Sequence, residues 1–276
     1  MFGSSKEPLI NFSLPEISLK AQALVGKLSI SGVQPKLSLK LDKKRGELVP
    51  ASEGGEYILK PQPQTFIHLP ENEQCCMDIA GALGIDTPAH CLLRLTDHSF
   101  AYIIKRFDLR KGQKIHQEDF SQLLGKDKYD GSVEQIGRKL KEVSSAPGLD
   151  SQLFFERVVL NFLLGNGDAH LKNYSINYDQ ALPIRLSPAY DIVSSKLVIP
   201  DEEDSALAIN GKKNKLSRED FDSFADYLQI PPKVRYERFL GKDSLIQDSI
   251  RASYLNSQEQ ERFVSIVQER YQRIRL

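Results

Sequence analysis

The sequence has few cysteines, no excess of charge of either sign and no long apolar run. Its three cysteines, Cys75, Cys76 and Cys91, cannot all pair with one another, so a reducing compartment is the simplest account of them. No CxxC spacing exists and the five histidines are scattered, which leaves no pattern typical of a structural zinc site. The 37 basic residues balance 37 acidic ones, so the overall field does not favour direct binding to nucleic acid.

The apolar runs are too short for a membrane-spanning protein. None approaches the roughly 20 apolar residues that cross a bilayer. Polar residues interrupt the opening MFGSSKEPLINFSLPEISLK, where a secretory signal needs an unbroken apolar segment. We therefore expect a cytoplasmic protein with no membrane partner. A length of 276 residues, 40% of them hydrophobic and 27% charged, suits one large globular domain or two lobes.

The chain up to about residue 107 has the pattern of short strands separated by turn residues. One helix interrupts them over residues 71–83, where Cys75, Ile79 and Leu83 recur at helical spacing and Gly84 follows as a stop. Strands are expected over residues 24–31, 36–41, 56–60, 90–95 and 99–107.

Longer helical periods follow residue 108. Helices are predicted over residues 133–143 and 151–164, and the second is too apolar for a surface helix, so it is expected to be buried. Two strands follow, over 174–178 and 184–188, and the chain is mainly helical again from residue 217. This order predicts an α+β, bilobal kinase-like fold. The β-rich N-lobe would cover residues 1–107 and the helical C-lobe residues 108–276, with nucleotide bound between them.

The strongest local signal is GNGDAHLKN, residues 165–173, which follows the buried helix. Its two glycines allow a sharp turn from which Asp168 can project. Phosphoryl transfer requires a carboxylate to deprotonate the attacking hydroxyl and an amide oxygen to hold a metal ion, and Asp168 and Asn173 have the D-x-x-x-x-N spacing of a kinase catalytic loop. Taken alone, the same spacing also fits a polar turn whose Asp and Asn only cap backbone groups.

Further residues add weight to the kinase interpretation. Asp191 follows the second of the two predicted strands and is a candidate second magnesium ligand. Lys60 ends a predicted strand, as the nucleotide-binding lysine of a kinase does. Its ion-pair partner is expected on the following helix, where Glu73 and Glu71 are rival candidates.

The segment 29–36, SISGVQPK, is a candidate phosphate-covering loop. It fits neither G-x-G-x-x-G nor the Walker pattern, and composition alone predicts a hairpin turn. If it covers phosphates, backbone N–H groups around Gly32 and the Lys36 side chain would contact them, whereas Pro35 offers no donor.

Seven blocks, in order and spacing, resemble the HipA kinase family. They span about residues 27–195 and read SISGVQPKLSL, YILKP, the NE of PENEQ, IKRFD, HQEDFSQLLG, GNGDAHLKN and PAYDIVSS. The resemblance implies a fold related to protein and phosphoinositide kinases, use of ATP and Mg²⁺, and phosphorylation of serine in a protein. The family's known substrates are aminoacyl-tRNA synthetases.

The resemblance also implies a role for each matching residue. Asp168 corresponds to the catalytic base, Asn173 and Asp191 to the metal ligands, and Lys60 with Glu73 to the lysine and its ion-pair partner. The remaining nucleotide-binding candidates are Gly32, Val33, Gln34 and Lys36 in the loop, Lys105 and Phe107 in the hinge, Asp108 at the ribose, and His170 and Lys172 near the phosphates.

The chain resembles the short HipT form of the family, because the long forms carry roughly one hundred further residues before the loop. Ser29 and Ser31 match the paired loop serines of that form, and either is a candidate autophosphorylation site that would silence the kinase. The implied function is the kinase toxin of a toxin–antitoxin system, with small HipB-type and HipS-type antitoxins as partners.

Two alternatives of other classes remain open. One is a catalytically silent pseudokinase that binds a partner, and the other is a non-enzymatic repressor subunit, although no helix-turn-helix signature or basic stripe supports it. The acidic run Asp201–Asp204 is predicted to be a solvated surface loop.

Overall fold

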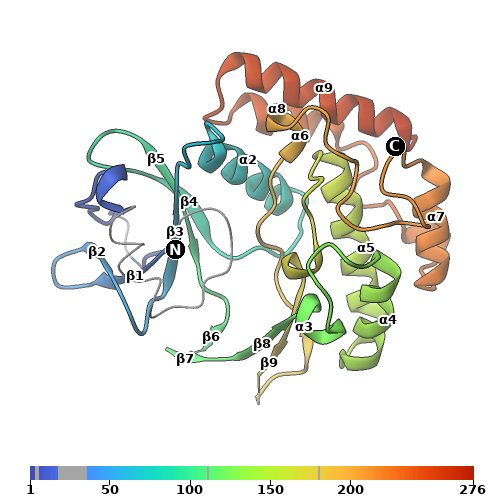
Figure 1. Ribbon diagram of the computed structural model, residues 1–276, viewed down its shortest axis with the longest axis horizontal. Helices are drawn as coiled ribbons and strands as arrows, with labels where there is room; N and C mark the ends of the chain where they lie inside the picture. Colours follow the sequence, from blue (N-terminus) through green and yellow to red (C-terminus); the bar gives the residue numbers. More distant parts are fainter. Residues whose placement is uncertain (4–5, 18–35, 111, 180) are drawn as a thin grey trace. The chain divides into compact units, whose positions relative to one another are not determined.

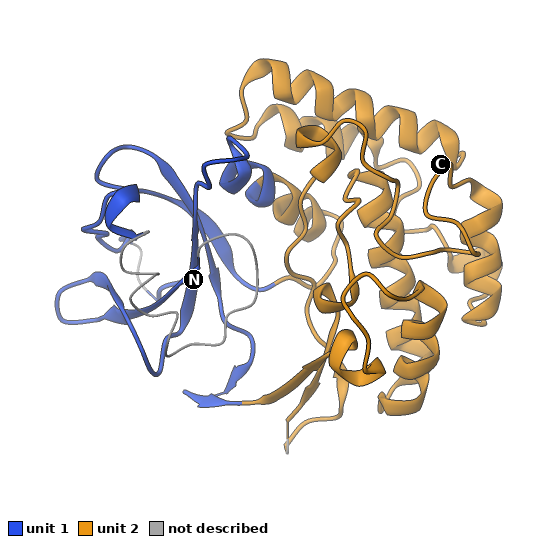
Figure 2. Ribbon diagram, in the orientation of Figure 1, with its two compact units in different colours: residues 1–74, 88–114 blue, residues 75–87, 115–276 orange. Residues whose placement is uncertain are grey.

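The computed structural model describes residues 1–276 except 4–5, 18–35, 111 and 180 (Figure 1). The chain forms two compact units (Figure 2). Unit 1 contains Met1–Gln74 and Pro88–Lys114, and unit 2 contains Cys75–Thr87 and Ile115–Leu276. The lobe boundary expected after residue 107 stays a prediction, and the strand expected over residues 24–31 lies outside the described residues.

Unit 1 is built on a five-stranded antiparallel sheet with the order β2-β1-β3-β5-β4. Alternating apolar residues on its strands, such as Leu37, Leu39 and Ile103, are fully buried in one hydrophobic cluster, as expected for a sheet with one covered face. The sheet strands are β1 (Leu37–Asp42), β2 (Glu47–Pro50), β3 (Tyr57–Pro61), β4 (His90–Arg94) and β5 (Phe100–Lys105), and a short ribbon pairs β6 (Leu109–Arg110) with β7 (Gln113–Lys114).

The predicted helix between these strands is confirmed as α2 (Leu69–Ala82). Cys75, Cys76 and Ile79 are buried, and Gly84 follows with φ +75°, a backbone conformation that glycine adopts without strain. The division between the two units falls within this helix, after Gln74.

Unit 2 contains a three-stranded antiparallel sheet in the order β10-β9-β8. Its strands are β8 (His116–Asp119), β9 (Ser175–Tyr178) and β10 (Arg185–Leu186). The sequence pattern predicted β9 and β10 but not β8, whose residues HQED lack the apolar alternation of a strand. β8 forms because it pairs with β9 along its whole length, from His116 with Tyr178 to Asp119 with Ser175.

The central helix of unit 2 is α5 (Pro147–Leu163), and it is buried as predicted. It begins at Pro147 rather than at residue 151, because proline is well tolerated in the first turn of a helix. α9 packs against α5, α6 and α8 (Figure 1). The other helical segments are α3 (Phe120–Leu124), α4 (Val133–Val143), η1 (Leu171–Asn173), α6 (Ser195–Val198), α7 (Arg218–Tyr227), η2 (Pro232–Val234), α8 (Asp243–Arg251) and α9 (Ser257–Arg273).

Within the part of the chain that the structure describes, every helix is too short or too polar to traverse a lipid bilayer.

Candidate active site

The catalytic turn begins where α5 ends. Gly165 has φ +67° and its N–H donates to Phe162 O at 3.0 Å, which closes the helix. A Cβ at Gly167 would lie only 2.5 Å from the backbone oxygen of Glu203, so this position needs glycine for a close approach of two backbones. The Gly167 N–H also donates to Ser195 Oγ at 2.8 Å. Glycine is therefore required at the two positions for different reasons: Gly165 adopts a left-handed backbone conformation, and Gly167 has no room for a side chain.

Asp168 projects from this turn and is exposed. Its backbone N–H donates to Asn166 Oδ1 at 3.3 Å, and its Oδ1 accepts a hydrogen bond from the Tyr129 hydroxyl at 2.7 Å. Asn166 in turn donates to Asn161 Oδ1, and Asn161 donates to the Tyr174 hydroxyl, both at 2.9 Å. A buried chain of polar groups thus anchors the turn from beneath.

Sequence reasoning missed two parts of this arrangement. Asn161 carried a usable signal, because it is an amide in an otherwise apolar stretch of a buried helix, where a polar group needs a specific partner. Tyr129 carried none, since nothing in the local pattern indicates that its hydroxyl reaches a residue 39 positions away.

Asn173 and Asp191 lie side by side. Asn173 Nδ2 donates to Asp191 Oδ2 at 2.9 Å, and Asn173 Oδ1 accepts from the His170 backbone N–H at 2.9 Å. Asp191 has φ +59°, a left-handed conformation that is uncommon outside glycine and is found enriched at functional sites. Folding therefore brings together the two residues that the sequence proposed as metal ligands.

The chemistry of this pair fits magnesium. An amide oxygen and a carboxylate are hard oxygen donors, and Mg²⁺ is usually bound by one or two carboxylates together with water and phosphate oxygens. No group of three His, Cys, Asp or Glu side chains arranged for a metal occurs among the described residues. A metal ion at this site would consequently depend on Asn173, Asp191 and the ligand's own oxygens.

His170 links the catalytic turn to the metal-ligand candidates. Burial lowers the pKa of His170, the charges of Asp168 and Asp191 oppose this shift, and Lys128 adds to it. Both carboxylates therefore lie close enough to His170 to affect its ionisation. The lowered pKa favours a neutral imidazole near pH 7. Lys172, the other predicted phosphate contact, is half-buried, and its carbonyl accepts a hydrogen bond from the Tyr190 hydroxyl at 2.9 Å.

The lysine candidate in unit 1 forms an ion pair. Lys60 Nζ lies 2.5 Å from Glu73 Oε1, and the two residues are 5% and 1% exposed. Lys60 is on β3 opposite Tyr102 of β5, whose ring centroid is 5.6 Å from its Nζ. Of the two glutamates considered from the sequence, Glu73 is the one that contacts Lys60 in this ion pair. A buried ammonium held in this way has a fixed position, as a phosphate-binding lysine requires.

The predicted hinge follows β5. Lys105 is the exposed last residue of that strand, and Phe107 is half-buried. Asp108 accepts two hydrogen bonds from Arg106, at 2.9 Å from Nε and 2.6 Å from Nη2, and these bonds raise the pKa of Arg106. The carboxylate expected at the ribose thus already binds an arginine in this structure.

The phosphate loop is largely outside the described residues. Ser29, Ser31, Gly32, Val33 and Gln34 all fall there, so their predicted roles stay predictions. Lys36, directly before β1, is described and is half-buried.

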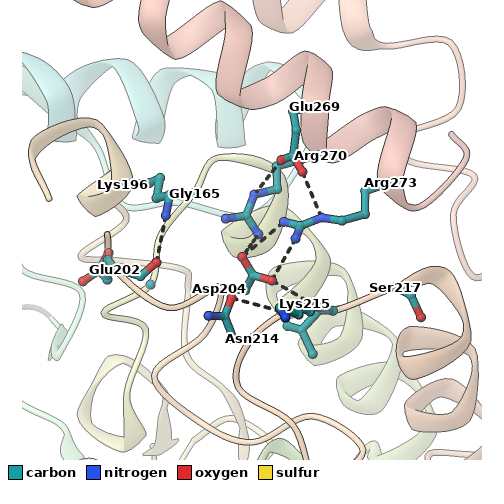
Figure 3. Close-up of polar contacts among 12 residues, drawn as sticks. Gly165, Lys196, Glu202, Asp204, Asn214, Lys215, Ser217, Glu269, Arg270 and Arg273 are labelled. Atoms are coloured by element: carbon teal, nitrogen blue, oxygen red, sulfur yellow. Dashed lines mark hydrogen bonds and ion pairs between the residues drawn. The ribbon is translucent and has the colours of Figure 1, made fainter. Parts of the chain in front are cut away.

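The prediction of a solvated acidic loop is wrong for Asp204. This residue is only 4% exposed, and its carboxylate forms ion pairs with Arg270 at 2.7 Å and Arg273 at 3.0 Å, both from α9 (Figure 3). It also accepts from the Leu216 N–H at 3.0 Å. Asp201, by contrast, is exposed as predicted. Asp204 is buried because two arginines distant in the sequence compensate its charge.

The same segment lies against the catalytic turn. The oxygens of Glu202 and Glu203 occupy the space beside Gly167. Lys196, which lies near Glu202 in Figure 3, donates from Nζ to the Glu202 backbone oxygen at 2.9 Å. Burial raises the pKa of the Glu202 carboxyl, and the negative charge of Asp168 acts in the same direction. The ion pairs of Asp204 therefore anchor a segment that packs directly on the turn carrying Asp168.

Comparison with known families gives a clear match. The model of the HipA-like C-terminal domain matches residues 28–250. A putative kinase Y4dM of Sinorhizobium fredii is 37% identical over 229 residues, covering 75% of this chain and 55% of that protein. A putative kinase of Haemophilus influenzae is 31% identical over 283 residues, covering 91% of this chain and 81% of that protein.

A more distant relative has a more specific name. The serine/threonine-protein kinase toxin HipA of Shewanella oneidensis is 27% identical over 231 residues, covering 74% of this chain and 52% of the toxin. The chain thus spans about half the length of the Y4dM kinase and of this toxin.

A solved structure shows the same fold. The HipA chain in the complex of Shewanella oneidensis HipA, HipB and operator DNA superposes with a TM-score of 0.71 at 22% identity, covering 90% of this chain and 65% of that one. This likeness confirms the predicted α+β kinase-like fold class.

Proposed function

The chain belongs to the HipA-like C-terminal domain family, and on that premise we propose that it is an ATP- and magnesium-dependent protein serine/threonine kinase. The observation that carries this proposal is the 2.9 Å hydrogen bond between Asn173 and Asp191. It joins an amide and a carboxylate 18 residues apart, next to a turn that projects Asp168. Capping of backbone groups by a polar turn does not require this long-range pairing.

Each residue has a distinct part in the proposed reaction. Asp168 accepts the proton of the acceptor hydroxyl as its oxygen attacks the γ-phosphorus. Asn173 and Asp191 hold the metal, and Lys60, fixed by Glu73, contacts the phosphates. ATP supplies the phosphoryl group, and Mg²⁺ supplies positive charge to its phosphate oxygens. The predicted contacts of Lys105, Phe107, Asp108, His170 and Lys172 with the nucleotide belong to the same proposal.

The finer proposal is a toxin of a toxin–antitoxin system, in the short HipT-like form. Support comes from the Shewanella oneidensis toxin named above and from the HipA–HipB complex in which its structure was solved. A protein substrate, with an aminoacyl-tRNA synthetase as the leading candidate, and small antitoxins of the HipB and HipS types are the corresponding partners. Autophosphorylation at Ser29 or Ser31 would add negative charge where phosphates bind and would silence the enzyme.

The direct test is transfer of labelled γ-phosphate from ATP to the purified protein and to proteins of a bacterial lysate. We expect label in serine or threonine when Mg²⁺ is present and none after chelation with EDTA. Nucleotide binding without any transfer would instead identify a pseudokinase, and transfer that persists in EDTA would contradict the metal assignment.

Substitution of Asp191 by asparagine is expected to weaken the binding of Mg²⁺·ADP about tenfold or more, which corresponds to about 1.4 kcal/mol. The substitution removes a negative charge from the metal while keeping the shape of the side chain. Calorimetric titration in Mg²⁺ and in EDTA measures the effect, and the difference between the two conditions should shrink. Asp201→Asn is the matched control, because it removes the same charge from an exposed position. Equal affinity of both variants and the wild type would contradict the role of Asp191.

A further inference from the structure

Two contacts hold the Tyr129 side chain against the catalytic turn. Its hydroxyl donates to Asp168 Oδ1 at 2.7 Å, and its ring meets His170 edge-on with centroids 5.3 Å apart. Lys128 Nζ lies 4.5 Å from the centroid of the same ring. The loop that carries Tyr129 is itself tied to the turn, because the Leu171 N–H donates to Lys128 O at 3.0 Å. Both the side chain of Tyr129 and the backbone of its loop are therefore fixed relative to the catalytic turn.

The hydrogen bond from Tyr129 restricts the rotamers of Asp168, the proposed base. Asp168 is exposed, and an aspartate in solvent samples several rotamers, whereas a general base must stay within hydrogen-bond reach of one proton. Within the described part of the chain, the Tyr129 hydroxyl is the one side-chain group that hydrogen-bonds this carboxylate. It engages Oδ1, which leaves Oδ2 to accept the proton of a substrate hydroxyl.

Tyr129 is suited to act as a permanent donor. Burial raises the pKa of its phenol, and the hydrogen bond to Asp168 acts in the same direction, so the hydroxyl keeps its proton at neutral pH. The residue is nevertheless 46% exposed, which means that packing alone does not account for the position of its side chain.

We infer that Tyr129 is a positioning residue for the catalytic base: its hydroxyl fixes the Asp168 carboxylate so that Oδ2 faces the acceptor hydroxyl of the substrate. This inference rests on the proposed kinase function. It assigns to the loop between α3 and α4 a part in turnover that the sequence motifs did not indicate.

The test is Tyr129→Phe, which removes only the hydroxyl and keeps the ring that contacts His170 and Lys128. We expect kcat to fall about tenfold to a hundredfold, the range seen when groups that orient an active-site ligand are lost. The KM for ATP, the affinity for Mg²⁺·ADP and the thermal midpoint should stay at wild-type values. Tyr227→Phe is the matched control, since Tyr227 is similarly exposed, at 44%, in the same unit.

A double-substitution cycle separates positioning from a structural role. In an Asp168→Asn background, Tyr129→Phe should have no further effect on the residual rate, because the group it positions has been replaced. Multiplicative losses in the double variant would overturn the inference. So would a wild-type kcat for Tyr129→Phe, or phosphate found on Tyr129 by mass spectrometry, which would make the residue an acceptor. Absence of transfer by the wild-type protein would instead refute the proposed function itself.

Discussion

Asparagine in place of Asp168 is expected to lower the turnover of phosphate transfer by about a thousandfold, within the range that general-base catalysis contributes. The amide has the shape of the carboxylate and can still accept the Tyr129 hydrogen bond, but it cannot take up the proton of the acceptor hydroxyl. Because Asp168 is exposed and makes no ion pair in the described structure, the fold should be unaffected. The loss should therefore be confined to the chemical step.

Steady-state transfer of labelled γ-phosphate measures this prediction, with calorimetry to show that Mg²⁺·ADP still binds. Asp130→Asn is the appropriate control, because Asp130 is also exposed and follows Tyr129 in the loop next to the turn. That variant removes a charge from the same neighbourhood and should retain wild-type turnover. A comparable kcat for Asp168→Asn and the wild type would rule out Asp168 as the base.

Alanine in place of Asp204 is expected to lower the free energy of unfolding by about 3 to 5 kcal/mol, the cost of removing one partner of a buried ion pair. Arg270 is 2% exposed and would keep an ion pair with Glu269 at 3.3 Å, but that carboxylate is 56% exposed and compensates a buried charge less well than Asp204 does. The Leu216 N–H would lose its acceptor. Arg273 is less affected, because its side chain is 26% exposed and water can solvate its charge. Urea unfolding followed by circular dichroism measures the change.

The Asp204 variant should also lose turnover. Asp204 anchors the segment whose Glu202 and Glu203 oxygens pack beside Gly167, so releasing it frees the turn that presents Asp168. Asp201→Ala is the control in the same acidic run, and it should change neither the free energy of unfolding nor the turnover. A double variant, Asp204→Ala with Arg270→Ala, should lose less stability than the sum of the two single changes, because the charges are coupled. Additive losses would show that the ion pair contributes no coupling.

Local sequence patterns predicted much of the fold. The helix expected over residues 133–143 is α4 with the same limits, because its apolar positions recur with the helical period and Ser132 accepts a hydrogen bond from Gln135 N as a cap. The start of α5 was placed too late, since Pro147 and Gly148 resemble a loop when tertiary packing is unknown. β8 was missed because a strand of four polar or half-buried residues depends on its partner rather than on its own composition.

The features of the candidate site likewise fall into those that local sequence determined and those that depend on tertiary packing. The sequence alone determined the glycine turn, the spacing of Asp168 and Asn173 and the blocks shared with the HipA family, because these depend on residues close together in the chain. Only the tertiary structure decided that Glu73 contacts Lys60, that Tyr129 meets Asp168 and that Asp204 is buried between Arg270 and Arg273. Arg273 lies 69 positions along the chain from Asp204. Local periodicity records which residues prefer to be buried, whereas the partner of a charged or hydroxyl group is set by how distant segments pack, and that packing determines whether the group is solvated or compensated.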